Sequence, residues 1–329
     1  MRRPAMLAGT LALLGFLCLL SIAVGSRQIP LDQVVRALTG PHDTATATIV
    51  WDVRVPRTVL GVLAGAALGL GGAVMQALTR NPLADPGLLG VSAGAAFALM
   101  LAVGLGGMTS LYGYVWFAFA GALVASVAVY VLGGLGRGGQ TPVKLALAGI
   151  AVTFLLESVT RGVSLIDPQV LNRYRFWSAG SLAGQNTALI VQVLPFLAVG
   201  AVLALSIAPA LNNIALGDDV ATSLGRRLRL IRLQGAVAVV LLTGAAVAVA
   251  GPIVFIGLVV PHAVRAISGP DQRWLLPLTA VLAPCLLLGA DIAARVVVRP
   301  QELDVGIVAA FIGVPVFIAL VRRRRLAEL

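Results

Sequence analysis

Long apolar runs without a charged residue constrain this chain more than any other feature of its sequence. The two clearest cover residues 58–79 and 86–136. A membrane-spanning helix needs about 20 apolar residues, whereas a membrane strand shows an alternating pattern that these runs lack. Only 11% of the chain is charged, against roughly 25% in a soluble domain. The sequence therefore predicts an all-α, polytopic membrane protein with almost no soluble part.

The apolar runs divide into ten helices when they are broken at charges, prolines and glycine clusters. We expect them at residues 5–25, 58–78, 87–104, 115–135, 144–164, 187–208, 232–250, 253–267, 274–296 and 305–321. They form a single transmembrane domain over residues 1–329. The first run is interpreted as a retained span rather than a signal peptide, because it is long for a signal sequence.

Two segments of similar sequence indicate that the domain has two inverted halves. Residues 65–68 read Gly-Ala-Ala-Leu with Gly72 following, and residues 244–247 read Gly-Ala-Ala-Val with Gly251 following. Five helices separate the two segments, so they run in opposite directions, as the repeats of many transporters do. Close packing of small residues is the alternative explanation.

The distribution of basic residues predicts the orientation. If both termini are cytoplasmic, 15 of the 24 Lys and Arg residues lie inside: Arg2, Arg3, Arg80, Arg137, Lys144, Arg226, Arg227, Arg229, Arg232, Arg265, Arg273 and residues 322–325. This bias follows the positive-inside rule and explains the net charge of +11. We therefore expect a multi-pass protein of the cytoplasmic (inner) membrane, in contact with lipid and not with nucleic acid.

The chain is poor in the side chains that enzymes use. It has two histidines and two cysteines, and it contains no HExxH motif, no cluster of metal ligands and no GxxxxGK[ST] phosphate loop. We predict that it is not an enzyme, holds no metal or cofactor, and hydrolyses no ATP by itself.

Two acidic residues lie within predicted spans and open a rival interpretation. Glu157 and Asp291 are each followed four residues later by an arginine, Arg161 and Arg295. Pairing on one helix is the structural interpretation. Ionisable residues at membrane depth are also candidates for proton coupling, so a proton-coupled secondary transporter is the alternative of another class.

The longest inside connection, residues 209–231, contains a short predicted helix. Asp218 or Asp219 suits its N-cap, and Gly225 suits its end. Val220 and Leu224 then share one apolar face. Such a helix could dock a cytoplasmic partner or be an ordinary loop helix.

Arginines also occur at the predicted outer ends of spans. Arg54 and Arg57 begin the second helix, and Arg295 ends the ninth. Guanidinium groups pair well with carboxylates. These arginines could dock an acidic soluble partner or pair with Asp52 and Asp291 of the same chain.

The turn at residues 81–90 joins the second and third helices. Its sequence is Asn-Pro-Leu-Ala-Asp-Pro-Gly-Leu-Leu-Gly, and the two prolines restrict its backbone. A rigid turn between two spans can carry a gate or a docking surface.

Motifs throughout the chain resemble the permease family of ABC importers for ferric siderophores, haem and cobalamin. They lie at residues 54–57, 71–76, 81–90, 147–149, 176–177, 180–182, 217–220, 224–225, 251–262, 271–276, 306–307 and 313–317. Residues 79–86 and 175–182 are most similar to the ferric-enterobactin type, which works as one half of a pair of different permeases.

The resemblance implies ten helices, an inverted repeat and both termini inside. It implies an inner gate at Asn81, Leu83 and Thr141, and binding-protein docking at Arg54, Arg57 and Arg295. Met75 and Gln76 become candidates for lining the path, with core packing as the alternative for Met75. The residues of the ATPase-coupling helix are Gly217, Asp218, Asp219, Val220, Leu224 and Gly225.

We therefore predict a permease subunit that moves a ferric siderophore into the cytoplasm. Its implied partners are two ATP-binding subunits that carry ATP and Mg²⁺, a second permease that is a paralogue rather than an identical copy, and an extracytoplasmic siderophore-binding protein. Haem or cobalamin is the alternative substrate within the family. An intramembrane enzyme is disfavoured by the missing catalytic residues.

Overall fold

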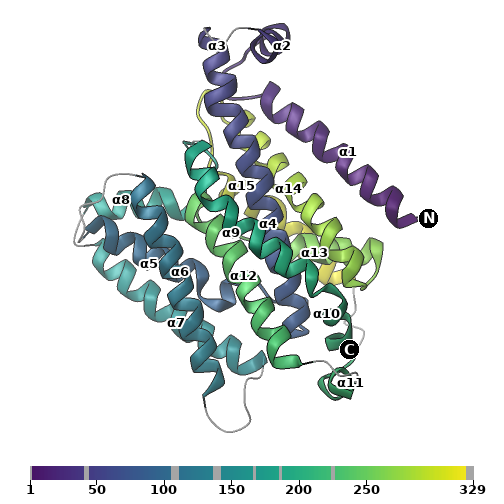
Figure 1. Cartoon of the computed structure of the whole chain (residues 1–329). Helices are drawn as coiled ribbons and strands as arrows, with labels where there is room; N and C mark the ends of the chain where they lie inside the picture. The colour runs from purple at the N-terminus through teal and green to yellow at the C-terminus, as the bar shows by residue number, and fades with distance from the viewer. Residues whose placement is uncertain are drawn as a thin grey trace.

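The computed structural model describes residues 2–40, 44–104, 111–135, 142–165, 168–184, 187–223 and 227–323, and within them the chain is helical without strands (Figure 1). Ten helices match the ten predicted ranges: α1 Arg2–Ala23, α4 Val55–Thr79, α5 Val91–Gly104, α6 Leu111–Gly134, α7 Pro142–Ser164, α9 Thr187–Ser206, α12 Leu228–Ala250, α13 Ile256–Ser268, α14 Gln272–Val296 and α15 Val305–Arg323. Seven helices in this part of the chain are long and apolar enough to cross a membrane, and α5, α13 and α15 are shorter apolar helices. The all-α, polytopic prediction is confirmed.

Several short elements connect the long helices. They are α2 Leu31–Thr39, α3 Ala45–Thr48, η1 Ile49–Arg54, η2 Pro86–Leu89, α8 Pro168–Ser178, α10 Ala208–Ala215 and α11 Asp218–Ser223. The sequence predicted only α11. The predicted helix ends differ from the observed ones by up to four residues: α5 begins at Val91 after the separate turn η2, and α13 begins at Ile256 after an unwound segment.

The helix of residues 45–79 is the longest in the described chain. Its 35 residues include α3, the π-helical η1 and α4. At 1.5 Å per residue it is about 50 Å long, well beyond the roughly 30 Å of a hydrocarbon core. Its first turns therefore project from the bundle, where they pack with α2 around a small core of Val34, Ala37, Ala47 and Val50. This knob lies at the end of the molecule opposite α11 (Figure 1).

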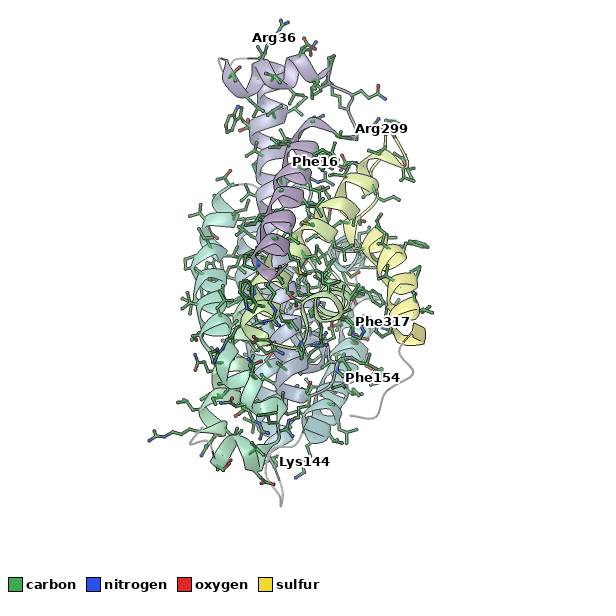
Figure 2. All side chains as sticks on the ribbon, turned by 90° about the vertical axis from the view of Figure 1, so that its right-hand side faces the viewer. Phe16, Arg36, Lys144, Phe154, Arg299 and Phe317 are labelled. Carbon is green, nitrogen blue, oxygen red and sulfur yellow. The ribbon has the colours of Figure 1, made fainter. Side chains whose placement is uncertain are left out.

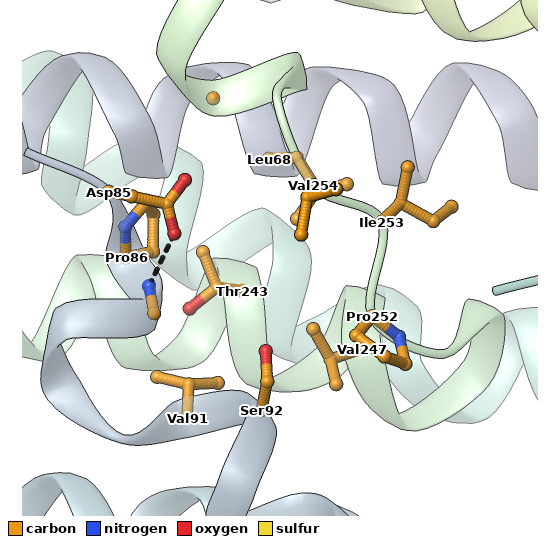
Figure 3. A pocket seen from close by; sticks show the side chains of 12 residues that line it. Leu68, Asp85, Pro86, Val91, Ser92, Thr243, Val247, Pro252, Ile253 and Val254 are labelled. Atoms are coloured by element: carbon orange, nitrogen blue, oxygen red, sulfur yellow. Dashed lines mark hydrogen bonds between the residues drawn. The ribbon is translucent and has the colours of Figure 1, made fainter. Parts of the chain in front are cut away.

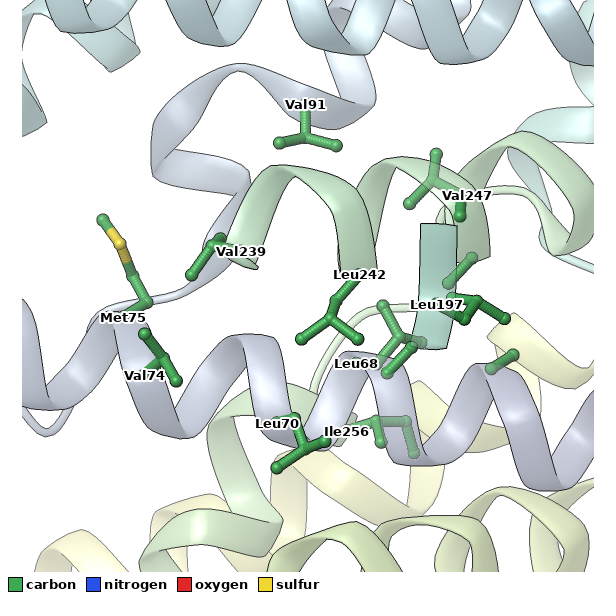
Figure 4. Close-up of a cluster of buried hydrophobic side chains, with 14 of the residues drawn as sticks. Leu68, Leu70, Val74, Met75, Val91, Leu197, Val239, Leu242, Val247 and Ile256 are labelled. Carbon is green, nitrogen blue, oxygen red and sulfur yellow. The ribbon is translucent and has the colours of Figure 1, made fainter. Parts of the chain in front are cut away.

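Helices α4 and α12 form the centre of the bundle. In the most apolar 18-residue stretch of each helix, 78% of the residues are buried in the helix that contains α4 and 72% in α12. The corresponding shares are 6% in α1 and 17% in α7. Leu68 of α4 lies beside Leu242 of α12, and both belong to one buried apolar cluster (Figure 4). The outer helices instead expose large apolar side chains such as Phe16 and Phe154 (Figure 2), as expected at a lipid surface.

Helices α4 and α12 run in opposite directions, because α4 starts beside the knob and α12 starts beside α11 (Figure 1). This is the arrangement expected for the two similar segments of the sequence. The inverted repeat itself stays a prediction.

Glycines let α4 approach its neighbours at backbone distance. A Cβ atom on Gly65 would lie 2.6 Å from the Cα atom of Pro284 in α14. One on Gly72 would overlap the Gly257 carbonyl group in α13. The obstructing atoms are backbone atoms, so the helices would have to separate to admit a methyl group.

We predict that Gly72→Ala lowers the free energy of unfolding by about 2 kcal/mol or more, since overpacking against backbone forces helices apart. Thermal unfolding of the purified chain in detergent measures the effect. Gly289→Ala is the matched control, because a Cβ atom on this helical glycine meets no atom within 4 Å. Equal stability of the two variants would contradict the packing assignment.

Candidate functional site

A network of buried charges lies at the end of the bundle nearest the knob. Arg57 of α4 contacts Asp291 of α14 with Nη2 at 2.8 Å, and its Nη1 is 2.6 Å from Oε2 of Glu302. Arg295 contacts the same Asp291 carboxylate at 2.9 Å. Asp291 is fully buried, and Arg57 and Arg295 are 5% and 2% exposed.

Arginines of this end also cap the C-terminal end of α1. Arg54 donates hydrogen bonds to the carbonyl groups of Ile22, Ala23 and Arg27 at 2.7–2.8 Å. Arg295 donates to the carbonyl groups of Ser21 and Val24. These bonds satisfy carbonyl groups that a helix end leaves without partners, and the positive charges suit the helix dipole. The arginines therefore join α1, α4 and α14.

The sequence left two interpretations of the arginines open: pairing within the chain, or docking of a soluble protein. Pairing within the chain is confirmed for Arg57 and Arg295, both of which contact Asp291. For Arg54 the suggested partner Asp52 is wrong: Asp52 is exposed, and Arg54 is directed at α1. Direct docking of a soluble protein on these three side chains is not tested, and it stays a prediction.

Glu302 is the most accessible member of the network, with 31% of its side chain exposed. It lies in the connection between α14 and α15, and its Oε1 accepts a hydrogen bond from Ser26. Burial alone would raise the pKa of Glu302, but the hydrogen bonds from Ser26 and Arg57 outweigh it and hold the pKa below its ordinary value. Glu302 is therefore ionised at neutral pH and ties this connection to α4.

An apolar cavity of about 620 Å³ lies along α15. Its wall combines the end of α8, the unwound segment between α12 and α13, and one face of α15; the lining includes Ala179, Pro252, Val254, Ile307, Phe311 and Val314. Ligand sites commonly have volumes of roughly 300–1,000 Å³, and transporters place them where helices are interrupted. Phe311 is 77% exposed, so the cavity is open at the surface of the isolated chain.

The turn at residues 81–90 lies at the far end of α4. Asn81 and Leu83 are exposed, and the Asn81 side chain accepts a hydrogen bond from the Leu83 N–H at 2.9 Å. Asp85 accepts a hydrogen bond from the Gly87 N–H at 2.7 Å and so caps η2 (Figure 3). The Asp85 carboxyl group, Ser92 and Thr243 border a cavity of about 30 Å³, enough for a water molecule. Burial raises the pKa of Asp85, and the Gly87 hydrogen bond lowers it only in part.

The two candidates for lining the path are buried inside the bundle. Met75 is 4% exposed and belongs to the core (Figure 4), so core packing is the arrangement found for it. Gln76 is 2% exposed and joins α4 to α13: its amide donates to the Gly257 and Leu258 carbonyl groups and accepts from Arg265. In this structure neither residue faces the cavity along α15.

The predicted coupling helix forms α11. It follows Gly217, and Asp219 and Val220 are exposed while Ala221 is buried. The side chain of Asp218 and residues 141, 224 and 225 lie outside the described part, so the positions predicted for Thr141, Leu224 and Gly225 are not described. The described residues that were predicted for the gate, for ATPase coupling and for docking are thus spread over both ends of the molecule rather than gathered in one site.

Comparison with known proteins identifies the family. Residues 13–323 match the FecCD transport family. The chain belongs to this family. FecCD proteins are permeases of ABC importers, that is, membrane transport subunits, and the prediction of a transport permease is confirmed.

Individual relatives of this FecCD chain are similar over nearly its whole length. The ferric enterobactin transport system permease protein FepD of Escherichia coli is 50% identical over 98% of this chain and 96% of its own. The iron(3+)-hydroxamate import system permease protein FhuB of Bacillus subtilis is 44% identical over 94% and 81%. Permeases named for hemin and for cobalamin import match at 38% and 41% identity.

A solved structure confirms the fold of this FecCD chain. A metal-chelate type ABC transporter in an inward-facing conformation matches with a TM-score of 0.87 at 27% identity, over 98% of this chain and 100% of the other.

Sequence reasoning missed three features of the site. The unwound wall of the cavity was signalled by Gly251-Pro252, but its role as a wall depends on α15, which is distant in sequence. Glu302 was not singled out, since nothing local links it to Arg57. The knob was missed because α2 is short and only moderately apolar.

We predict that Asp291→Asn costs about 3 kcal/mol of stability, because it leaves the buried Arg295 without its carboxylate partner and Arg57 with Glu302 alone. Denaturation of the purified variant measures the loss. Glu157→Gln removes the exposed pair with Arg161 and should cost less than about 0.5 kcal/mol. Similar losses in both variants would contradict the central place of the buried network.

Proposed function

We propose that this chain is one of two permeases that together carry a ferric siderophore into the cytoplasm, driven by ATP hydrolysed on two partner subunits. The observation that carries the proposal is the 50% identity to a ferric enterobactin permease along almost the entire chain. The hydroxamate permease, which also serves iron import, matches at 44%. Haem and cobalamin are the alternative substrates, supported by relatives of lower identity.

The cavity along α15 supports transport of a large complex. It is wide, apolar and open, and among the described residues no ionisable side chain lines it. A site with few charges holds a large complex weakly, which suits a path that must release its cargo. We propose that the second permease, a paralogue of this chain, closes the open side of this cavity and completes the path.

The acidic residues favour this mechanism over proton coupling. Asp291 is held between two arginines, and Glu157 pairs with Arg161 at 3.1 Å. Both carboxylates are therefore already engaged in ion pairs within the chain. The pairs leave little reason to assign either residue a proton-carrying role.

We further propose the sidedness predicted from the basic residues. Lys144 lies at the end of the bundle opposite Arg36 and Arg299 (Figure 2). The proposal puts Lys144, α11 and both termini in the cytoplasm, and the knob outside. A binding protein would then approach the knob and Glu302, with Arg54, Arg57 and Arg295 behind them. The inner gate would be formed by Asn81 and Leu83, with Thr141.

Uptake into proteoliposomes tests the function. The permease pair with its ATPase subunits is reconstituted with the binding protein, and iron-loaded enterobactin is supplied outside. We expect accumulation that requires ATP, is unaffected by a protonophore, and is lost with a catalytically inactive ATPase subunit. Uptake that persists without ATPase subunits and collapses with the protonophore would overturn the proposal. Preferential uptake of hemin or cobalamin would overturn the substrate.

We predict that Val220→Asp weakens ATPase binding, because it puts a charge on the exposed apolar face of α11. Co-purification of the ATPase subunits should fall at least about tenfold, the loss expected for a contact worth roughly 1.4 kcal/mol. Val35→Asp is the matched control, since Val35 is similarly exposed at the opposite end, on α2. Undiminished co-purification with Val220→Asp would show that α11 is not the docking helix.

A further inference from the structure

A pair of side chains at the inner end of the bundle links α10 to the start of α14. The amide nitrogen of Asn212 donates to Oδ1 of Asp271 at 2.7 Å, and its amide oxygen accepts from the Gln272 N–H at 2.8 Å. We call this pair the Asn212–Asp271 clasp. One hydrogen bond is donated by Asn212 and the other is accepted by it, so the clasp fixes both the distance and the orientation between α10 and the start of α14.

Further contacts hold the Asp271 side of the clasp in place. Asp271 caps α14 by accepting from the Arg273 N–H at 3.1 Å, and Arg3 of α1 lies 3.5 Å from its second oxygen. The hydrogen bond from Asn212 is the main cause that keeps the pKa of Asp271 below its ordinary value. The carboxylate is therefore charged at neutral pH, and charge-assisted hydrogen bonds are the stronger kind.

The Asn212 side of the clasp is continuous with α11. Leu211 and Ile214 are fully buried, and they anchor α10 on the bundle. Backbone hydrogen bonds continue through the turn: Gly217 N–H donates to Ile214, and Ala221 N–H donates to Gly217, at 3.1 and 2.9 Å. A displacement of α11 is therefore passed to α10 and to Asn212.

On the other side, Asp271 lies in the turn between α13 and α14. Helix α13 has 13 residues and is about 20 Å long at 1.5 Å per residue. Its far end is Phe255, which has a left-handed backbone (φ +71°) and packs against Gly313 of α15, where an added Cβ would lie 2.6 Å from the Phe255 Cβ. Val254 and Pro252, just before it, line the cavity.

We propose that the Asn212–Asp271 clasp is the positioning contact through which movement of α11 reaches α13 and the cavity wall. The inference rests on the proposed function, in which α11 docks the ATPase. Neither residue lines the cavity along α15. Their role is to make the inner ends of α10, α13 and α14 move together.

Variants of the clasp test the proposal by the amount of iron transported per ATP hydrolysed. In the full complex in proteoliposomes, with iron-loaded enterobactin as the probe, Asn212→Ala should retain its ATPase subunits. We expect ATP hydrolysis within about twofold of wild type and a loss of about tenfold in iron per ATP, a usual size for coupling between sites.

The exchange variant Asn212→Asp/Asp271→Asn supplies a rescue. After the exchange the carboxylate on α10 accepts from the Gln272 N–H and from the new amide, so both bonds of the clasp can form. The cap from the Arg273 N–H is lost, because an amide nitrogen takes the place of the Asp271 oxygen that accepts it. Iron per ATP should return to within about threefold of wild type, since the geometry of both bonds is retained. If the clasp served fold stability alone, iron transported per ATP hydrolysed would not change in a variant that still assembles.

Gln234→Ala is the matched control. It removes another side-chain hydrogen bond between helices, Gln234 to Ser206 at 2.9 Å, which joins α12 to α9 and bypasses the clasp. Iron per ATP should be unchanged in this variant.

Two results would overturn the proposal. One is an unchanged ratio in Asn212→Ala. The other is loss of the permease or of its ATPase subunits in both Asn212→Ala and Asp271→Asn with recovery in the exchange variant, which would make the clasp a folding contact. If the proposed function is wrong, the wild-type complex itself will not import iron at the expense of ATP. If only the proposal for the clasp is wrong, the wild-type complex imports iron and the variants give the results just described.

Discussion

The backbone contact of α4 with α13 and α14 is the constraint on which the rest of the structure depends. Gly65 and Gly72 admit neighbouring backbone where any side chain would collide. Lipid provides no hydrophobic drive for helix association, so close van der Waals packing must supply the attraction. Once α4 is held in this way, its end nearest the knob brings Arg54 and Arg57 to α1 and α14. Its other end supports the turn at residues 81–90, and α13 is set beside the cavity.

The buried charges complete this arrangement rather than compete with it. Arg57 and Arg295 share Asp291, and Arg54 and Arg295 cap α1. In the most apolar stretch of α1 only 6% of the residues are buried. A helix with so few buried residues needs polar contacts of this kind to stay in place. Arginines that looked like an external docking surface in the sequence thus hold together the end of the bundle nearest the knob. Of their two carboxylate partners, Asp291 is fully buried and Glu302 is open to an approaching molecule.

The sequence was sufficient for the long helices and insufficient for what lies between them. Apolar runs predict the ten helices that match the expected ranges, because burial in lipid leaves few other options for such segments. The direction of a side chain depends on a neighbour that is far away in sequence: Gln76 joins Gly257 across 181 positions, and Arg57 meets Asp291 across 234. Pairing of Arg57 and Arg295 with Asp291, and core packing of Met75, were each one of two alternatives that the sequence could not decide between. The break at Gly251-Pro252 was visible in the sequence, but not that the unwound segment reaches residue 255, because its backbone is stabilised by contacts with α8 and α15.

The central claim is that the open apolar cavity along α15 becomes one wall of a closed path when the complete importer assembles. A structure of the purified complex, with the second permease and the ATPase subunits, tests this claim most directly. The account predicts that the second permease covers Phe311 and the face of α15 around it, and that an ATPase subunit contacts α11. A complex in which α15 faces lipid, or in which the ATPase contacts the bundle elsewhere, would contradict it.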